Sequence, residues 1–456
     1  MNKFLRYAAF AALSMLCVAC SSSGDDDGSG GGDSGSTGGG SGSVSDTNIG
    51  SFPSSDAISS IPQPTLGYRW VLNETFSDEF NGTTLDSSKW YDYHPTWYGR
   101  YPGYFLTENV SVADGTLQIK GSYLGEDSGK IAYGSEYTIG CGAVVSKSQA
   151  AHYGYYECCF KANKTTLSTT FWLSTRTNYP DDGTIPATLG TGTYQEELDI
   201  CETVGRLGTL SGTSMAYGMN SNIHYWFTPS GGSSTDYATG GTLQVRDDNR
   251  MPSDDYNIYG CWWRDESNAT VYYNNNSGID KPFTNSTIGT FKLPQPMGMN
   301  FVVETYGTSW IDEPTEDELV DPDKNVSYYD WVRSYTLESM TSAPTSTPEM
   351  SHIFTNQIAL DESTIAVSSY GAFTFKVSYT APEDSVIKMY LCNPSTGDVL
   401  MSSESNAYAG YGYMSIAITE PTEDLYKYTV VVYLVDDSST SIADAYAGDS
   451  FEFTAI

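Results

Sequence analysis

One stretch of the sequence decides the fold and concentrates the chemistry: Gln195-Glu196-Glu197-Leu198-Asp199-Ile200-Cys201-Glu202. Its acids are interleaved with Leu, Ile and Cys, a pattern too apolar for a solvated loop. Alternate residues of a strand share a face, so Glu197 and Asp199 point one way and Glu202 points the other. One extra residue, a β-bulge at Ile200-Cys201, would return Glu202 to the face of the other two. The spacing therefore predicts a bulged strand with three acids on one face.

Two carboxyl groups about 5–5.5 Å apart can hydrolyse a glycosidic bond with retention of configuration. In that chemistry Glu197 would be the nucleophile, and Glu202 would act first as general acid and then as base. Glu202 must then hold a proton, so its pKa must lie above the usual ~4.3, as neighbouring carboxylates would ensure. Asp199 would assist by hydrogen bonding to Glu197. The spacing alone leaves open an acidic strand edge or a set of calcium ligands.

The acid stretch resembles the signature of glycoside hydrolase family 16, in the bulged form found in agarases, porphyranases and κ-carrageenases. Flanking stretches resemble the same branch in the same order, and together they span about residues 65–340. They are residues 76–80, 97–102, 109–117, 153–157, 171–173, 222–224, 259–263, 304–306 and 329–333. The resemblance implies a β-sandwich jelly roll that acts as a retaining endo-hydrolase on β-1,4 linkages of red-algal galactans.

The resemblance also indicates residues that bind substrate. Flat aromatic faces dock on sugar rings, and polar groups fix the hydroxyls. The candidates are Trp97 and Arg100 in a loop, Trp172 on the cleft floor, Arg176 at a strand end, His224 beside the acid, and Glu304. The alternatives are core packing for the aromatic residues and His224, and a structural salt bridge for Glu304.

The identity of the polymer depends on the cations. Porphyran and carrageenan carry sulfate esters, which a chain of net charge −34 repels at long range. Local arginines are the best sulfate partners. The basic residues nearest the matching segments are Arg100, Lys147, Arg176, Arg206 and Arg264. Their concentration favours a β-porphyranase, with β-agarase or κ-carrageenase as alternatives and a non-catalytic surface glycan-binding lipoprotein as an alternative of another class.

Composition predicts an all-β protein, because the chain holds 36 Tyr and 44 Gly and shows no convincing helical periodicity. The charge argues against nucleic acid and anionic membranes as partners. We expect a monomer that needs no cofactor and has no metal-ligand cysteine spacing. The six cysteines after residue 20 are expected to be buried thiols, with a disulfide as the alternative. The resemblance allows a structural calcium ion, for which the sequence indicates no ligands.

The N-terminal residues resemble a bacterial lipoprotein signal. Lys3 and Arg6 precede an apolar run too short to span a membrane, and residues 1–20 end at Cys20, the expected lipid anchor. Residues 21–64 are rich in Gly, Ser and Asp and predict a disordered tether. We therefore expect a lipoprotein exposed at the outer-membrane surface, attached only through its lipid. An ordinary signal peptide is the alternative.

The remainder is expected to form two domains. Residues 65–340 would form the catalytic jelly roll, and residues 341–350, which contain two prolines, would form a linker. Residues 351–456 hold short alternating runs separated by turn signals, which is typical of an immunoglobulin-like sandwich. This second domain contains no Trp, so a spacer or weak binder is expected.

Overall fold

A computed structural model of the chain describes residues 59–274, 277–344, 347–362, 366–368, 371–422, 425–439 and 442–455. The predicted signal, Cys20 and tether residues 21–58 lie outside the described residues. Strands dominate the described ranges, which confirms the all-β prediction. No helix in these ranges is long and apolar enough to cross a bilayer.

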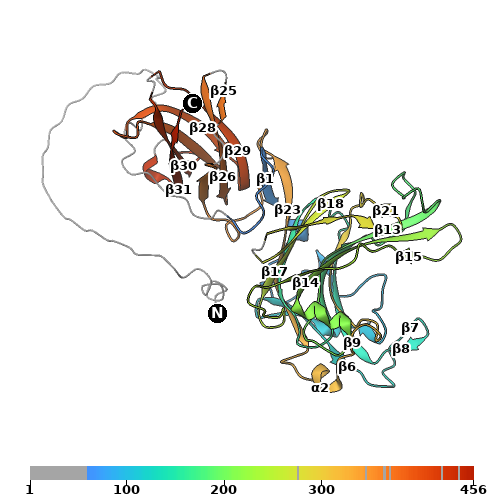
Figure 1. Ribbon diagram of the computed structural model, residues 1–456. Coiled ribbons are helices and arrows are strands. Elements are labelled where there is room, and N and C mark those ends of the chain that lie inside the picture. The colour runs from blue at the N-terminus through green and yellow to red at the C-terminus, as the bar shows by residue number, and fades with distance from the viewer. Residues whose placement is uncertain are drawn as a thin grey trace, which may run out of the picture. The chain divides into compact units, whose positions relative to one another are not determined.

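Glu197, Asp199 and Glu202 lie on one strand of a largely antiparallel sheet that we call the catalytic sheet. Figure 1 labels several of its strands. Its strand order is β15 (Thr235–Asp236), β14 (Gly218–Pro229), β13 (Gly192–Val204), β11 (Ser168–Ser174), β22 (Gly298–Val303), β9 (Ile139–Ser146) and β2 (Trp90–Tyr91). Short strands extend its edges: β3 (Gly103–Phe105), β6 (Ser122–Tyr123), β12 (Tyr179–Pro180) and β16 (Thr242–Val245). Residues of β9 and β11 are all buried, so these strands form the centre of the fold.

A second sheet packs against the catalytic sheet. It contains β19 (Ile279–Pro282), β18 (Asn268–Tyr273), β17 (Asn257–Asp265), β10 (Gly154–Lys161), β23 (Val326–Ser339), β1 (Tyr68–Leu72), β4 (Val110–Ala113) and β5 (Thr116–Lys120). The two sheets enclose one apolar core, in which Phe301 of β22 meets Tyr329 of β23 edge-on with ring centres 5.4 Å apart. Five cysteines, 141, 158, 159, 201 and 261, are buried within this core region or its strands, and no disulfide joins the cysteines of the described residues.

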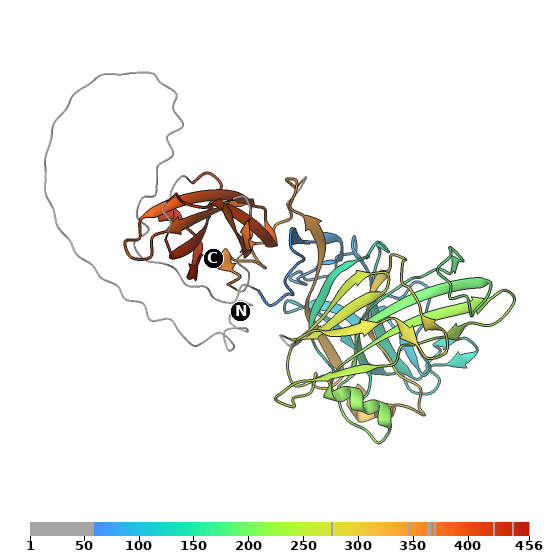
Figure 2. The same cartoon turned by 45° about the horizontal axis from the view of Figure 1, so that its top comes forward.

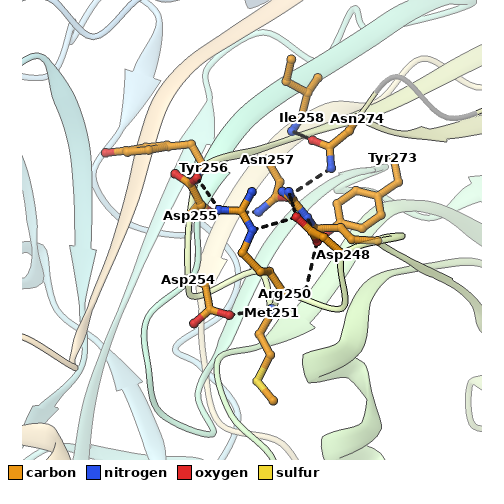
Figure 3. A network of polar contacts seen from close by, with 11 residues as sticks. Asp248, Arg250, Met251, Asp254, Asp255, Tyr256, Asn257, Ile258, Tyr273 and Asn274 are labelled. Atoms are coloured by element: carbon orange, nitrogen blue, oxygen red, sulfur yellow. Dashed lines mark hydrogen bonds and ion pairs between the residues drawn. The ribbon is translucent and has the colours of Figure 1, made fainter. Parts of the chain in front are cut away.

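Short elements complete this part of the chain. They are the hairpins β7 (Ile131–Ala132) with β8 (Ser135–Glu136) and β20 (Thr284–Asn285) with β21 (Gly289–Thr290), helix α2 (Glu316–Leu319), and 3₁₀ turns at Glu74–Phe76, Thr107–Asn109 and Ser211–Tyr217. Figure 3 shows a polar network in the loop before β17, in which Arg250 joins Asp248 to Asp255. Arg250 binds Asp248 at 2.8 Å and Asp255 at 3.0 Å. Because these charges are largely exposed, the network orders the loop more than it stabilises the fold.

A second sandwich with its own core follows (Figure 2). One layer holds β24 (Gln357–Leu360), β25 (Ala366–Ser368), β26 (Ala372–Ala381) and β29 (Gly410–Thr419), and the other holds β28 (Val399–Ala407), β27 (Ser385–Cys392), β30 (Lys427–Asp436) and β31 (Ala447–Thr454). A 3₁₀ turn at Ile442–Asp444 precedes β31. Between β23 and β24, where the linker was expected, positions 345 and 346 lie outside the described residues. Strand β1 pairs with β23 and also with β29, through Tyr68–Trp70 and Tyr411–Tyr413, a pairing that the sequence did not predict.

Candidate active site

The predicted bulge is present on β13. Opposite β14, Asp199 pairs with Asn222 and Glu202 pairs with Asn220, so three steps on β13 face two steps on β14. The register with β11 shifts at the same level, where Trp172 faces Asp199 and Phe171 faces Cys201. Ile200 is buried, and its carbonyl accepts a hydrogen bond from the Ser221 hydroxyl at 2.8 Å. The extra residue is therefore held inside the fold, and Glu202 turns to the face of Glu197 and Asp199.

These acids line one cleft with a volume of about 440 Å³. Its other lining residues come from the loop before β3 and from strands β11, β13, β14 and the end of β22. They are His94, Thr96, Trp97, Arg100, Thr170, Trp172, Ser174, Thr175, Arg176, Gln195, Glu196, Trp226 and Glu304. Because these elements are neighbours in the catalytic sheet, the cleft crosses the strands from β14 towards β9. An elongated ligand would therefore lie across the sheet, over the three acids.

The two glutamates have unusual acidities. Burial, together with the charge of Asp199, raises the pKa of Glu197 well above its usual value. Burial and Asp199 likewise raise the pKa of Glu202, to about 8. The charge of Glu202 is a further cause of the raised pKa of Glu197, so ionisation of one carboxyl favours retention of the proton on the other. One ionised and one protonated carboxyl is the state that a nucleophile and a general acid require.

Tyr306 is the direct partner of Glu202. Its hydroxyl donates a hydrogen bond to Glu202 Oε1 at 2.8 Å. The Tyr306 ring is buried and packs edge-on against Trp310, and the Arg100 guanidinium lies 5.6 Å from its centre. Tyr306 thus holds the Glu202 carboxyl in one orientation and links it to the arginine end of the cleft.

His224 lies beside Asp199 on the neighbouring strand. Its Nε2 is 3.2 Å from Asp199 Oδ2, and its Nδ1 is 2.8 Å from Asp236 Oδ2. Burial opposes a charge on the ring, but hydrogen bonds with Asp199 and Asp236 prevail and raise the pKa of His224 to about 11. The Asn222 amide nitrogen, 2.9 Å from Nε2, could donate only to a neutral ring. The surrounding carboxylates outweigh that single contact, so His224 is an imidazolium at neutral pH.

The hydrogen bond expected from Asp199 to Glu197 is not the contact that Asp199 makes. Its polar contact in the described residues is with His224, and no hydrogen bond joins it to Glu197. An oxygen of Asp199 nevertheless lies within 4.8 Å of one on Glu197 and of a His224 nitrogen. Asp199 therefore acts on Glu197 through charge, while His224 partly neutralises the cluster.

Five of the six predicted substrate-binding residues line the cleft: Trp97, Arg100, Trp172, Arg176 and Glu304. The sixth, His224, lies behind Asp199 instead and contacts acids. Arg100 Nε binds Glu304 Oε2 at 3.0 Å, so the salt bridge considered for Glu304 is present inside the cleft. The Arg100 side chain is 48% exposed and that of Glu304 is 7% exposed, so the arginine can still reach a ligand.

Only two of the five cations named from the sequence line the cleft, namely Arg100 and Arg176. Arg206 pairs with Glu318, Arg264 lies 4.2 Å from the centre of the Trp262 ring, and Lys147 binds the Ser87 carbonyl. The expected concentration of cations around the cleft was therefore wrong for these three. Proximity in sequence to a segment that resembles the family does not bring a side chain to the cleft side of the sheet.

Several residues of the site carried too weak a sequence signal to be assigned. His94 lines the cleft and stacks on Trp172 with ring centres 6.5 Å apart. Burial, with the charge of Arg176, lowers the pKa of His94 to about 4, so it is neutral. Trp226 lines the cleft and stacks on His224 at 5.9 Å. Asp236 contacts His224, and Tyr306 contacts Glu202. The fold brings these residues together, and no local sequence pattern indicates the two contacts.

Among the described residues, the group of His, Cys, Asp and Glu side chains that could hold a metal ion is Glu197, Asp199 and His224. Calcium requires six to eight oxygen ligands, whereas this group offers two carboxylates and an imidazole engaged by acids on both nitrogens. These residues do not fit the structural calcium ion that the resemblance allows.

Comparison with known proteins agrees with this geometry. The family model described as "Beta-porphyranase A-D, GH16 domain" matches residues 70–337, more than half of the chain. The chain is 40% identical to β-porphyranase D of Zobellia galactanivorans over 364 residues, covering 78% of this chain and 82% of that protein. It is 38% identical to β-porphyranase B of Phocaeicola plebeius over 293 residues, covering 62% and 90%.

A solved structure shows the same fold. The crystal structure of a β-porphyranase from the human gut bacterium Bacteroides plebeius aligns with a TM-score of 0.53 and 36% identity, covering 62% of this chain and 96% of that chain. The match confirms the jelly-roll fold expected for the first sandwich, and the three comparisons together confirm the resemblance drawn from the acid stretch. This chain belongs to glycoside hydrolase family 16, in its group of β-porphyranases A–D.

Proposed function

We propose that this protein is a retaining endo-hydrolase of β-1,4 linkages in red-algal galactans, and that porphyran is its substrate. The observation that carries the proposal is the bulged strand β13, which turns Glu197, Asp199 and Glu202 into one cleft that also holds Arg100 and Arg176. The family membership supports the same reaction class. A cleft open across the sheet suits internal cleavage of a polymer.

The reaction would proceed in two displacements. Glu197 attacks the anomeric carbon while Glu202 gives its proton to the glycosidic oxygen, so the C–O bond breaks and the leaving chain departs as an alcohol. Glu202, now ionised, removes a proton from water, and that water displaces Glu197 from the sugar. Asp199 and His224 set the charge around the nucleophile, and Tyr306 orients Glu202.

Sulfate recognition is assigned to the two arginines of the cleft. In the described residues Arg100 uses only Nε in a hydrogen bond, with Glu304, which leaves its two amino groups for a ligand. Arg176 donates from Nη2 to the Ser146 carbonyl. Its buried Nε has no hydrogen-bond partner among the described residues. Guanidinium groups bind sulfate oxygens through paired hydrogen bonds, so these arginines favour a sulfated galactan over agarose.

The test compares initial rates of purified protein on porphyran, agarose, κ-carrageenan and laminarin. We expect the highest rate on porphyran, release of internal fragments, and retention of anomeric configuration by NMR. The Glu197→Gln variant should bind porphyran without cleaving it. Equal behaviour of wild type and Glu197→Gln, with both correctly folded, would instead indicate a glycan-binding protein, and faster cleavage of agarose would reassign the substrate.

We also propose, from the sequence, that the protein is a surface-exposed lipoprotein anchored through Cys20, acts as a monomer, and needs no metal or cofactor. The supporting feature is the signal-like segment that ends at Cys20, followed by a Gly- and Ser-rich stretch. Metabolic labelling with a fatty-acid analogue should mark the wild type but not Cys20→Ala, and proteinase added to intact cells should remove the protein. Light scattering should give the mass of one chain.

A further inference from the structure

A short segment of the chain carries Asp236 to the active site. We call residues 235–242 the strap, because they run along the edge of β14 from β15 to the first residue of β16. The backbone amides of Tyr237 and Thr239 donate to carbonyls of β14 at 3.0 and 2.9 Å. The strap thereby brings the Asp236 carboxylate to within 2.8 Å of His224 Nδ1, while the other ring nitrogen contacts Asp199. The position of the strap therefore decides whether the His224 ring keeps its second acid.

The strap has little means of its own to hold this position. It contains Gly240-Gly241, and Gly240 has φ +87° with open space where a Cβ would lie. Glycine loses more backbone entropy on ordering than any other residue, so a Gly-Gly pair is costly to fix in one conformation. Every residue of the strap is exposed or half-buried, and of these described residues only Tyr237 packs against the apolar core. Contacts from outside the strap must therefore fix its end.

Lys281 makes such a contact from inside the fold. It lies on β19 opposite the core residue Ala269, so its side chain points inward from the second sheet, and it is only 4% exposed. Its ammonium donates to the Gly240 carbonyl at 2.5 Å and to the Thr242 hydroxyl at 2.9 Å. The second sheet thus holds the end of a strap that belongs to the catalytic sheet.

The Lys281 ammonium has no carboxylate partner. It forms no ion pair with the described residues, and burial lowers the pKa of Lys281 to about 8, although the charge of Asp199 opposes this shift. An unpaired buried ammonium costs several kcal/mol, which an apolar side chain of the same size would avoid. Thr242 pairs with Ser221, whose hydroxyl donates to the Ile200 carbonyl in the catalytic bulge. A costly charge beneath the strap and beside the bulge indicates a role in the active site rather than in the core.

We propose that Lys281 is a positioning residue of the active site and acts through the strap. Its ammonium fixes one end of the strap, and the strap in turn keeps Asp236 on His224. A loose strap would leave the His224 ring with one acid instead of two, so the ring would lose its charge more easily and compensate Asp199 less. Lys281 is not among the described residues that line the cleft, so it acts without touching the substrate. This inference rests on the proposed function, because it concerns the same reaction.

The test replaces Lys281 by methionine in the full-length protein, which removes the ammonium and keeps most of the volume. We expect kcat on porphyran to fall on the order of tenfold, the rate equivalent of about one hydrogen bond, with KM changed by less than about twofold. NMR of 15N-labelled histidine at pH 9, with the His224 signal assigned by its loss in His224→Gln, reads the charge of the ring. Because the pKa of His224 is about 11, the wild type should show a charged ring, whereas Lys281→Met should show neutral ring as well.

Two further variants separate positioning from folding. Lys388→Met is the matched control, because Lys388 is a second buried lysine, 7% exposed, that pairs with Glu404 in the second sandwich. Its replacement should change the melting temperature and leave kcat and the His224 signal as in the wild type. Thr242→Val removes one acceptor of the ammonium and keeps the branched shape on β16, so it should act in the same direction as Lys281→Met but less strongly. If Lys281→Met does not fold, Thr242→Val decides the question.

Combination with Asp236→Asn shows whether Lys281 acts through the strap. If it does, Asp236→Asn should lower kcat in the wild type and have little further effect in Lys281→Met. The inference is overturned if the two losses of kcat multiply, or if Lys281→Met and Thr242→Val lower the melting temperature alone. The His224 signal needs no turnover, so it distinguishes these outcomes from absence of porphyran cleavage by the wild type, which would overturn the proposed function.

Discussion

Replacement of Tyr306 by phenylalanine tests the electrostatics of the site most directly, because it removes one hydroxyl and keeps the ring. That hydroxyl donates to Glu202 Oε1 at 2.8 Å, whereas the ring retains its contacts with Arg100 and Trp310. A hydrogen bond to a charged group contributes about 1.5–3 kcal/mol, and one pKa unit corresponds to about 1.36 kcal/mol. Because Glu202 is only half-buried, the lower end applies, and its pKa should rise by about one unit.

The sign follows from the state that the hydroxyl stabilises. Tyr306 favours the ionised carboxylate, so its loss makes the last proton of the Glu197–Glu202 pair harder to remove. The pKa of Glu202 is about 8 in the wild type, and cleavage requires this proton. The alkaline limb of kcat/KM on porphyran should therefore move from near pH 8 towards higher pH, by about one unit.

The assay is the pH dependence of kcat/KM, measured from pH 5 to 10 with melting temperatures at each pH. Tyr379→Phe is the matched control, because Tyr379 is buried in the core of the second sandwich and its hydroxyl donates to the Tyr408 carbonyl at 2.9 Å. Tyr379→Phe should lower stability and leave the alkaline limb in place. A Tyr306→Phe profile that superimposes on the wild type, or that shifts to lower pH, would show that Tyr306 does not control this proton.

Further changes test the other parts of the site. Glu197→Gln should lower kcat by about three orders of magnitude or more with an unchanged melting temperature, as turnover assays and calorimetry can show. Arg100→Lys keeps a charge beside Glu304 but loses the forked geometry, so KM should rise about tenfold on porphyran and hardly at all on agarose. Asp236→Asn removes one acid from His224, whose pKa of about 11 lies above the ordinary 6.5. The stabilisation that the His224 charge contributes is complete below about pH 6.5 and disappears as the pH rises through 11. The melting temperature of Asp236→Asn should therefore fall below that of the wild type by about 2–4 °C near pH 6, and the difference should vanish towards pH 11. Dialysis against EDTA should leave kcat/KM unchanged, since the two carboxyls supply both the nucleophile and the proton.

The second sandwich shows what the alternation of apolar and polar residues can predict and what it cannot. Alternating runs predicted β-structure after residue 350, and two layers with a separate core are present there. The pairing of β1 with β29 could not be predicted, because both strands have one free edge and the sequence does not encode which edges meet. Strand formation follows from local alternation, whereas strand neighbours follow from the whole topology.

The predictions for the active site also separate into those that follow from local sequence and those that need the whole fold. The sequence by itself determined that Glu197, Asp199 and Glu202 share a face, because side chains alternate with a period of two and a spacing of three needs a bulge. Only the tertiary structure brought Tyr306 to Glu202 across 104 positions, placed Asp236 on His224, and directed Lys147, Arg206 and Arg264 away from the cleft. The first result depends on backbone geometry within one strand. The second depends on strand order and register in the folded sheet, which no local pattern specifies.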